Sequence, residues 1–399
     1  MEIYPRESRP EPGVPGRVIG ELYGPERPGC ITILYDDGNN WVPSDPFPSA
    51  PLGEARQLRE DMKWVYAADP YRNILVDGGF EVWQGPRTYV LPGVSQLCQG
   101  CDMWSEGQLS VPGNFTVSRV AGLSTGSRYA LRWQRTAGTN TATFCSLTAL
   151  SETALCLRAA GQRLTLSFLV RGGANFKGTS INGTGKNLRV AIATGTGTDE
   201  GTFAAWTGQV NFDSYFQVTP GVVQRCQTTI TVPSGAAELG VTFIWAHDVA
   251  AAGASDYIEF DDVQMEVNDI ATPFERLPFD VTLERVQRYR QKSFLYDTAP
   301  AQNAGYGGCI NFYADVAGVG LALTPPIQFA PRMRTAPVMT YYNPAAANAF
   351  VFNVTLGTSA TTTFSANAGD RGITTAFNGL AAWAVGNSLA VNWSADARL

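Results

Sequence analysis

Residues 255–294 read SDYIEFDDVQMEVNDIATPFERLPFDVTLERVQRYRQKSF, and they divide the chain in two. The first part, Asp256 to Met265, mixes aromatic and branched residues with carboxylates and predicts a half-buried strand. Pro273 then interrupts regular structure, and Pro278 with a capping residue at Asp280 predicts the start of a short helix. Strand, corner and helix together predict a junction between two β-rich domains.

The predicted helix carries one apolar stripe. Leu283, Val286 and Tyr289 recur every three residues, which places them on one face of a helix. Such a stripe packs against a neighbouring surface. We assign these three residues to oligomerisation.

Length and composition favour an all-β protein of two or three domains. The chain has 399 residues, enough for a sizeable core in each domain. Charged residues make up 16% of it, below the roughly 25% of an average soluble protein. Long helical patterns are scarce, and short strand-like runs between Gly-rich turns are frequent.

Charge and hydropathy exclude some partners. The net charge is -6, and Lys and Arg do not cluster with aromatic residues, so we do not expect nucleic acid as a partner. The opening MEIYPRESRPEPG lacks the apolar core of a signal peptide, and no apolar run reaches the length of a membrane span. We therefore expect no membrane insertion.

Six short motifs occur in a fixed order between residues 73 and 294. They are NILVDGGFEVWQ (73–84), DMW (102–104), FTVSR (115–119), VQME (263–266), ATPFE (271–275) and QRY (287–289). In this order they resemble the carbohydrate-binding-like module of bacteriophage tail fibre and spike proteins. The resemblance implies a jelly-roll module within a virion protein.

The N-terminal segment, residues 1–72, is rich in Pro and Gly, with one strand-like run at Cys30 to Tyr35. A helix is predicted over Pro51 to Ala68, where Leu58, Met62, Val65 and Tyr66 share one face. This helix could cap the next domain or pack on copies of itself. By resemblance, the segment anchors the protein to other virion proteins.

Residues 73–277 predict a two-sheet sandwich, most simply a jelly roll. Leu164, Leu166, Phe168 and Val170 alternate strictly within Arg163 to Arg171. Further strands are predicted at 188–193, 228–232 and 239–245.

The linker helix occupies 278–294, and a C-terminal β domain follows over 295–399, with strands predicted at 337–342, 350–356 and 388–393. From Asn343 onward the only charged residues are Asp370, Arg371, Asp396 and Arg398. A monomeric domain would carry more surface charge, so we expect other chains to cover this domain. By resemblance the assembly is a trimer.

The residues that carry redox or nucleophilic chemistry are sparse. Seven cysteines show no disulfide rhythm and are read as free thiols. The pair Cys98 and Cys101 has zinc-ligand spacing, but no second pair accompanies it. His247, the one histidine, is interpreted as a loop residue rather than a catalytic base, and no cofactor is required.

Carboxylates near the end of the module allow two further readings. Glu259, Asp261 and Asp262 could support glycoside hydrolysis, in which case Glu259 and Asp261 share one side of their strand. The plainer reading is charge on an exposed strand face. In jelly rolls resembling this one a structural calcium lies near the first and last strands, which implies Glu81 with Asp261 or Asp262 as ligands. Solvated carboxylates are the alternative.

Sugar binding needs exposed aromatic rings. We expect Trp83, Trp104, Trp133 and Trp245 in the core. Trp206, between turn-rich tracts, and the nearby Tyr215 are the predicted carbohydrate-binding residues.

The resemblance thus implies a virion appendage, a tail fibre or spike, assembled in the host cytoplasm. It would be a non-enzymatic homotrimer that attaches to host-surface polysaccharide. A purely structural adaptor or spacer fibre is the alternative, and a glycan depolymerase is a further one.

Overall fold

The computed structural model forms two compact units, Met1–Tyr71 and Arg72–Leu399. Over residues 1–70 it describes only the backbone of seven strands. From residue 71 onward it describes residues 71–91, 95–97, 100–108, 114–141, 143–201, 205–248, 250–314, 321–347, 351–360, 362–379 and 383–399.

The N-terminal unit contains one five-stranded sheet. Its parallel pair is β1 (Glu2–Pro5) with β2 (Val18–Leu22), and β3 (Cys30–Asp36) pairs antiparallel with β2, β4 (Trp41–Pro43) and β5 (Ala50–Pro51). The strand predicted at Cys30 to Tyr35 is confirmed.

The helix predicted over Pro51 to Ala68 is not found in the described residues of that stretch. β6 (Arg56–Leu58) and β7 (Trp64–Tyr66) pair there as antiparallel strands. Aromatic and β-branched residues such as those of β7 favour strands, and this preference outweighs the helical spacing. The rest of 51–68 lies outside the described residues.

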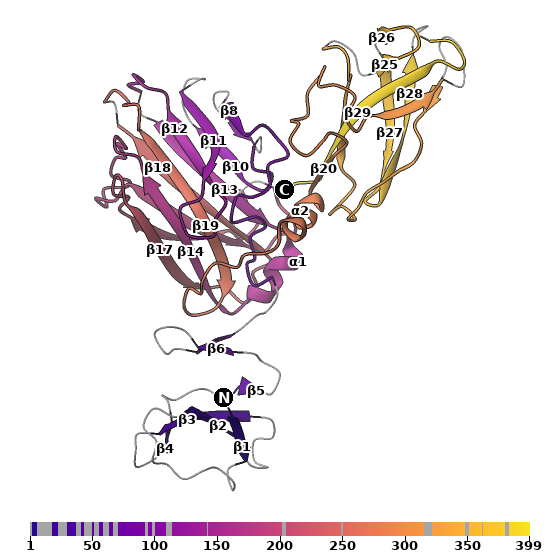
Figure 1. Cartoon of the computed structure of the whole chain (residues 1–399). Helices are drawn as coiled ribbons and strands as arrows, with labels where there is room; N and C mark the ends of the chain where they lie inside the picture. The colour runs from indigo at the N-terminus through magenta and orange to yellow at the C-terminus, as the bar shows by residue number, and fades with distance from the viewer. Residues whose placement is uncertain are drawn as a thin grey trace. The chain divides into compact units, whose positions relative to one another are not determined.

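The second unit begins with a sandwich of two antiparallel six-stranded sheets (Figure 1). Most successive strands cross from one sheet to the other, which is the connectivity of a jelly roll. One sheet has the order β16 (Val210–Phe216), β15 (Leu188–Gly195), β18 (Glu238–His247), β13 (Thr143–Ser151), β10 (Ser105–Gln108), β9 (Ser95–Leu97). The other has the order β17 (Val223–Thr231), β14 (Arg163–Gly172), β19 (Tyr257–Val267), β12 (Tyr129–Arg135), β11 (Phe115–Ala121), β8 (Thr88–Val90).

The sandwich core forms where the alternating apolar residues of both sheets meet. Trp83, Trp104, Trp133 and Trp245 are all buried there, as predicted. The rings of Trp133 and Trp245 meet edge to face with their centroids 5.0 Å apart, a favourable aromatic geometry. Aromatic packing therefore fixes the distance between the sheets.

Strand β19 is central and buried on both faces, whereas the sequence predicted a half-buried strand. Its pairing with β14 contains an irregularity, and Asp262 adopts a φ of 49° at that place. A bulge shifts the side-chain alternation by one residue. As a result Phe260 and Val263, three residues apart, both enter the core.

Short helices flank the sandwich. They are α1 (Thr153–Cys156), the 3₁₀ turn η2 (Leu157–Ala159) and α2 (Phe279–Gln287). The predicted linker helix is present as α2, but it ends at Gln287, because Arg290–Lys292 forms strand β20. None of the helices among the described residues is long and apolar enough to cross a membrane.

The C-terminal domain is a second β structure built around two long strands, β28 (Gly372–Gly379) and β29 (Ser388–Asp396). Its core includes Phe312, Tyr341, Phe377 and Leu389. Strands overlap all three predicted stretches, as β24, β25 and β29. Besides β20, β29 pairs with β21 (Ile310–Tyr313), β24 (Val338–Tyr342) and β25 (Val351–Asn353), which carries β26 (Thr358–Ala360); β28 pairs with β22 (Leu321–Leu323), β23 (Ile327–Gln328) and β27 (Thr362–Ala368).

Candidate functional site

One outward face of the sandwich combines small and tall side chains. In β15 the residues Leu188, Val190 and Ile192 belong to the core, so the residues between them point outward. Cross-strand register extends this face over β16, β18 and β13. We call it the small-residue face and define it by eight residues: Tyr215, Asp213, Asn211, Arg189, Ala191, Thr242, Thr148 and Phe144.

The centre of the small-residue face is closed to solvent. Ala191, Thr242 and Thr148 point outward, and yet all three are buried. The hydroxyls of the two threonines lie 2.8 Å apart. Longer side chains border this floor, among them Phe144, which is 51% exposed. Neighbouring side chains therefore cover these three residues, and the groups that a ligand could reach on this face are the taller side chains, such as Phe144, Asn211 and Asp213.

Polar groups line one edge of the small-residue face. On β16, Asn211, Asp213 and Tyr215 alternate with inward residues. Asp213 forms an ion pair with Arg189 at 2.9 Å. Asn182 Nδ2 donates to the Tyr215 hydroxyl at 3.1 Å. Tyr215 was predicted from the sequence, but Asn211 and Asp213 were not, although the alternation in VNFDSYF (210–216) places all three on one face of the strand.

Trp206 does not have the exposure predicted for it. It is buried, and its indole Nε1 donates to the Glu200 carbonyl at 2.9 Å. The side chain packs where Gly195 and Gly240 leave space, since a Cβ at Gly240 would lie 2.9 Å from the ring and one at Gly195 would lie 3.1 Å from the Trp206 Cβ. The position of Trp206 between turns did not indicate that two glycines leave space for its side chain. Trp206 is a packing residue and cannot stack on a sugar in this structure.

The opposite outward face is charged, and its charges are paired. Glu259 lies between Arg132 and Arg171 on neighbouring strands and bonds them at 2.7 Å and 2.6 Å. Its side chain is fully buried beneath the two guanidinium groups. The expectation of an exposed carboxylate is therefore wrong for Glu259, because long arginine side chains cover it.

Asp261 and Asp262 are also occupied. Asp261 is buried, not exposed as expected, and accepts the Leu123 backbone N–H at 2.7 Å. Burial, with neighbouring Asp262, raises the pKa of Asp261 to about 7. Asp262 bonds Arg276 through both oxygens, at 2.8 Å and 2.9 Å.

Burial also raises the pKa of Glu81, the third residue of the predicted calcium site, above its usual range. Among the described residues no group of three or more His, Cys, Asp or Glu side chains is arranged to hold a metal ion. The ion pair of Asp262 with Arg276 leaves its oxygens already bonded. The calcium site stays a prediction.

His247 was predicted to be a loop residue, but it belongs to a strand. It ends β18, is buried, and its Nε2 accepts the indole N–H of Trp245 at 3.2 Å. Burial and the nearby Arg135 lower the pKa of His247 to about 3. It is therefore neutral near pH 7 and acts as a core residue between the rings of Phe115 and Phe176.

The described cysteines are free, and most are buried: Cys101, Cys145, Cys156 and Cys226, with Cys309 partly exposed. Burial raises the pKa of Cys101 well above its usual range, so it stays a thiol. Cys98, the other member of the predicted pair, lies outside the described residues.

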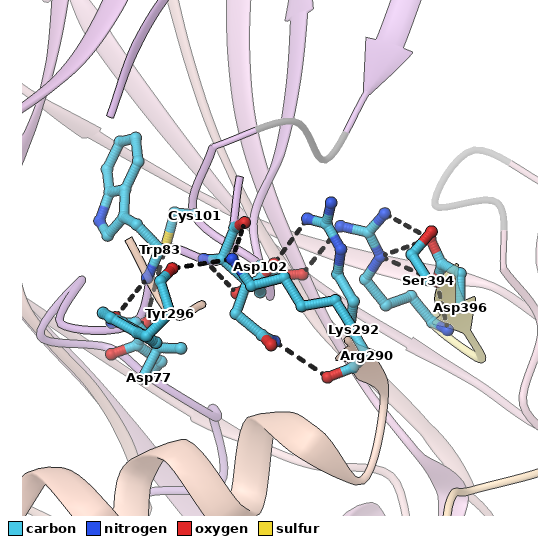
Figure 2. Close-up of polar contacts among 12 residues, drawn as sticks. Asp77, Trp83, Cys101, Asp102, Arg290, Lys292, Tyr296, Ser394 and Asp396 are labelled. Carbon is cyan, nitrogen blue, oxygen red and sulfur yellow. Dashed lines mark hydrogen bonds and ion pairs between the residues drawn. The ribbon is translucent and has the colours of Figure 1, made fainter. Parts of the chain in front are cut away.

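A buried polar network joins the sandwich to the C-terminal domain (Figure 2). Asp102 accepts the Gln84 backbone N–H at 2.9 Å and pairs with Arg290 of β20 at 2.6 Å. Lys292 Nζ donates to three carbonyl oxygens, those of Gln84, Tyr296 and Thr298, at 2.7–2.8 Å. Burial lowers the pKa of Lys292 to about 8.

Asp77 holds the opening loop of the sandwich. Its carboxylate accepts the backbone N–H groups of Glu81 and Val82 at 2.8 Å and 3.0 Å, and Trp104 Nε1 donates to its carbonyl at 3.0 Å. Burial raises the pKa of the Asp77 carboxyl to about 7. Asp77 and Trp104, two residues of the six motifs, thus stabilise the fold.

The apolar stripe of α2 packs within the chain. Val286 and Tyr289 are buried in a cluster with Val76 and Val82, and the partly buried Leu283 packs against it. Their assignment to oligomerisation is corrected, because the sandwich itself supplies the neighbouring surface. The spacing predicted a contact but could not say with which chain.

No family profile and no curated protein matches the sequence. Similar solved structures include TmCBM61 in complex with β-1,4-galactotriose, at 13% identity and a TM-score of 0.28, covering 49% of this chain and 99% of that one. The CBM22-1–GH10 modules of Clostridium thermocellum endo-1,4-β-D-xylanase 10B, complexed with xylohexaose, are 12% identical with a TM-score of 0.28, covering 50% of this chain and 29% of that one. The enzymatically active domain of bacteriophage CBA120 tailspike protein 4 is 11% identical with a TM-score of 0.27, covering 42% and 19%. The chain thus spans less than a third of the last two. The jelly-roll assignment rests on the strand topology.

Proposed function

We propose that this protein is a virion appendage, a tail fibre or spike, that binds host-surface polysaccharide without cleaving it. The observation that carries the proposal is the small-residue face, where the aromatic rings of Phe144 and Tyr215 share one sheet face with the hydrogen-bonding side chains of Asn211 and Asp213. Rings of this kind stack on the apolar faces of pyranoses, and carboxylates and amides orient their hydroxyls.

The shape of the face suits a short run of sugar units. Three inter-strand spacings separate β16 from β13, about 14 Å in all. Tyr215 borders this width at one edge, and Phe144 lies on the strand at the other. Each sugar contact of this type is weak, so repeated sites on an oligomer would raise the apparent affinity.

Binding rather than cleavage is proposed because the buried carboxylates described above already have partners. Glycoside hydrolysis needs one carboxyl group to donate a proton and another to attack or activate water. Glu259, Asp262 and Asp102 each pair with arginine. A release of reducing ends from host polysaccharide would favour the depolymerase alternative.

We also propose that the C-terminal domain assembles into a homotrimer and that the N-terminal unit attaches to other virion proteins. Large apolar side chains are exposed on the C-terminal domain: Val338 at 73%, Tyr313 at 67%, Val385 and Leu356. The last 57 residues carry four charged side chains, fewer than a solvated surface would have. Light scattering on the full chain would give a trimer mass.

The binding proposal is tested by calorimetry of the full chain with host polysaccharide fragments. Tyr215→Ala should weaken binding about tenfold, which is about 1.4 kcal/mol, and Phe144→Ala should act in the same direction. Tyr257→Ala is the matched control, because Tyr257 is a half-buried ring on the opposite sheet, over which Arg132 lies at 4.1 Å. Equal losses in all three variants would remove the small-residue face as the site. An intact virion that binds no glycan would favour the spacer alternative.

A further inference from the structure

The C-terminal domain contains a depression of about 570 Å³. It lies where β23 and β27 pair with opposite edges of β28. Its lining includes Gln328, Asn367, Thr374 and two arginines, Arg332 and Arg371. It belongs to a different domain from the small-residue face and is independent of it.

Register brings the neutral polar groups of the depression to one side of the sheet. Asn367 faces Thr374 across β27 and β28, and Gln328 faces Gly372 across β23 and β28. Gly372 and Thr374 are two residues apart, so they lie on the same face of β28. Gly372 adds no side chain, which keeps this part of the floor low. Two amides and a hydroxyl therefore surround an open floor.

The backbone fixes both arginines at this place. Phe329 N–H donates to the Arg371 carbonyl at 2.9 Å, and Met333 N–H donates to the Asp370 carbonyl at 2.8 Å. These bonds hold the segment that carries Arg332 against the turn that carries Arg371. The main chain thus brings both arginines to the lining of the depression, although they are distant in sequence.

The depression has a net positive charge. Arg332 forms an ion pair with Asp370. In the described part of the chain no hydrogen bond or ion pair of the exposed Arg371 guanidinium is found. The other two charged residues after Asn343, Asp396 and Arg398, pair with each other. Arg371 is therefore an exception in a region where charge is scarce.

We infer that this depression binds an acidic saccharide, with Arg371 and Arg332 holding its carboxylate. A guanidinium group matches a carboxylate with two parallel hydrogen bonds. The side chains of Asn367, Gln328 and Thr374 can both donate to and accept from sugar hydroxyls. Neutral sugars would use these groups but leave the positive charge uncompensated. The site is thus selective for uronic-acid-type sugars over neutral ones.

The test is calorimetry of the full chain with trigalacturonate and with the neutral galactose trimer. Wild type should bind the acidic trimer at least tenfold more tightly. Arg371→Gln should remove most of that preference, and Arg332→Gln should reduce it. Lys177→Gln is the charge-matched control, because Lys177 is exposed on a sandwich loop, and it should change the affinity less than twofold. Tyr215→Ala should leave the acidic trimer unaffected, which separates this site from the small-residue face.

Three results would overturn the inference. One is equal affinity of wild type for the two trimers. The second is an equal loss in Arg371→Gln and Lys177→Gln, with unchanged melting temperatures. The third is competition by inorganic phosphate at the same concentration as the acidic trimer, which would mean a simple anion site.

Discussion

Replacing Gly78 by alanine should destabilise the sandwich more than most single substitutions. A methyl carbon at Gly78 would lie 1.8 Å from the carbonyl oxygen of Val263 and 3.0 Å from Asn73 Nδ2. The opening loop would have to move away from β19. Two bonds depend on this approach, from Val263 N–H to the Gly78 carbonyl at 2.9 Å and from Asn73 Nδ2 to the Val263 carbonyl at 3.0 Å.

The loss can be sized from these two hydrogen bonds. Each contributes about 1 kcal/mol, and each buried group left unpaired costs about 1–3 kcal/mol. We expect Gly78→Ala to lower the free energy of unfolding by about 3–5 kcal/mol. With a urea m value of about 2 kcal/mol/M, the midpoint of unfolding falls by roughly 1.5–2.5 M.

Gly235→Ala provides the control for the effect of the methyl group itself. No heavy atom lies within 4 Å of a Cβ at Gly235, and its φ is outside the left-handed region. This variant should be unchanged or more stable by about 0.4–1 kcal/mol, since alanine restricts the unfolded chain. Unfolding is followed by tryptophan fluorescence, because four tryptophans belong to the sandwich core. If both variants unfolded at the same urea concentration, the close approach of Gly78 to β19 would be refuted.

Three further predictions concern buried charge. The pKa of Asp77 is about 7 in the folded protein against 3.8 for a free side chain. The folded state therefore holds the proton of Asp77 more tightly than the unfolded state does. The stability that this proton contributes is lost as pH rises from about 4 to 7. Over that range wild type should lose roughly 4 kcal/mol more than Asp77→Asn, and parallel stability curves would contradict this. Glu259→Gln should lower the free energy of unfolding by about 2–3 kcal/mol, because it removes two charge-assisted hydrogen bonds. Glycan binding should stay intact, because these bonds are far from the small-residue face. Loss of binding in a folded variant would indicate that the glycan site lies on the opposite sheet. Asp102→Asn should lower the free energy of unfolding by about 3 kcal/mol, since it leaves the largely buried guanidinium of Arg290 without its carboxylate partner. A urea unfolding curve identical to that of wild type would argue against a stabilising role of the polar network between the sandwich and the C-terminal domain.

The sequence by itself determined the alternating strands of the sandwich, its core and the break at 268–278. Alternation in Arg163 to Arg171 depends on neighbours two residues apart, and these apolar residues are indeed buried. Proline chemistry is equally local, which explains why the helix begins directly after Pro278. Large aromatic residues within strands enter the core wherever a second sheet covers them. Such signals need no knowledge of distant residues.

Only the tertiary structure decided which side chains are available for function. Glu259 looked exposed until Arg132, 127 positions away, covered it. Trp206 was predicted to be exposed, but Gly195 and Gly240 leave space for its side chain, which is buried. The apolar stripe predicted on the helix packs against the sandwich. The bulge at Asp262 also shifted which residues of β19 face inward. Exposure depends on what lies across the strand or above the sheet, and those partners are brought together by long-range pairing that local sequence does not encode.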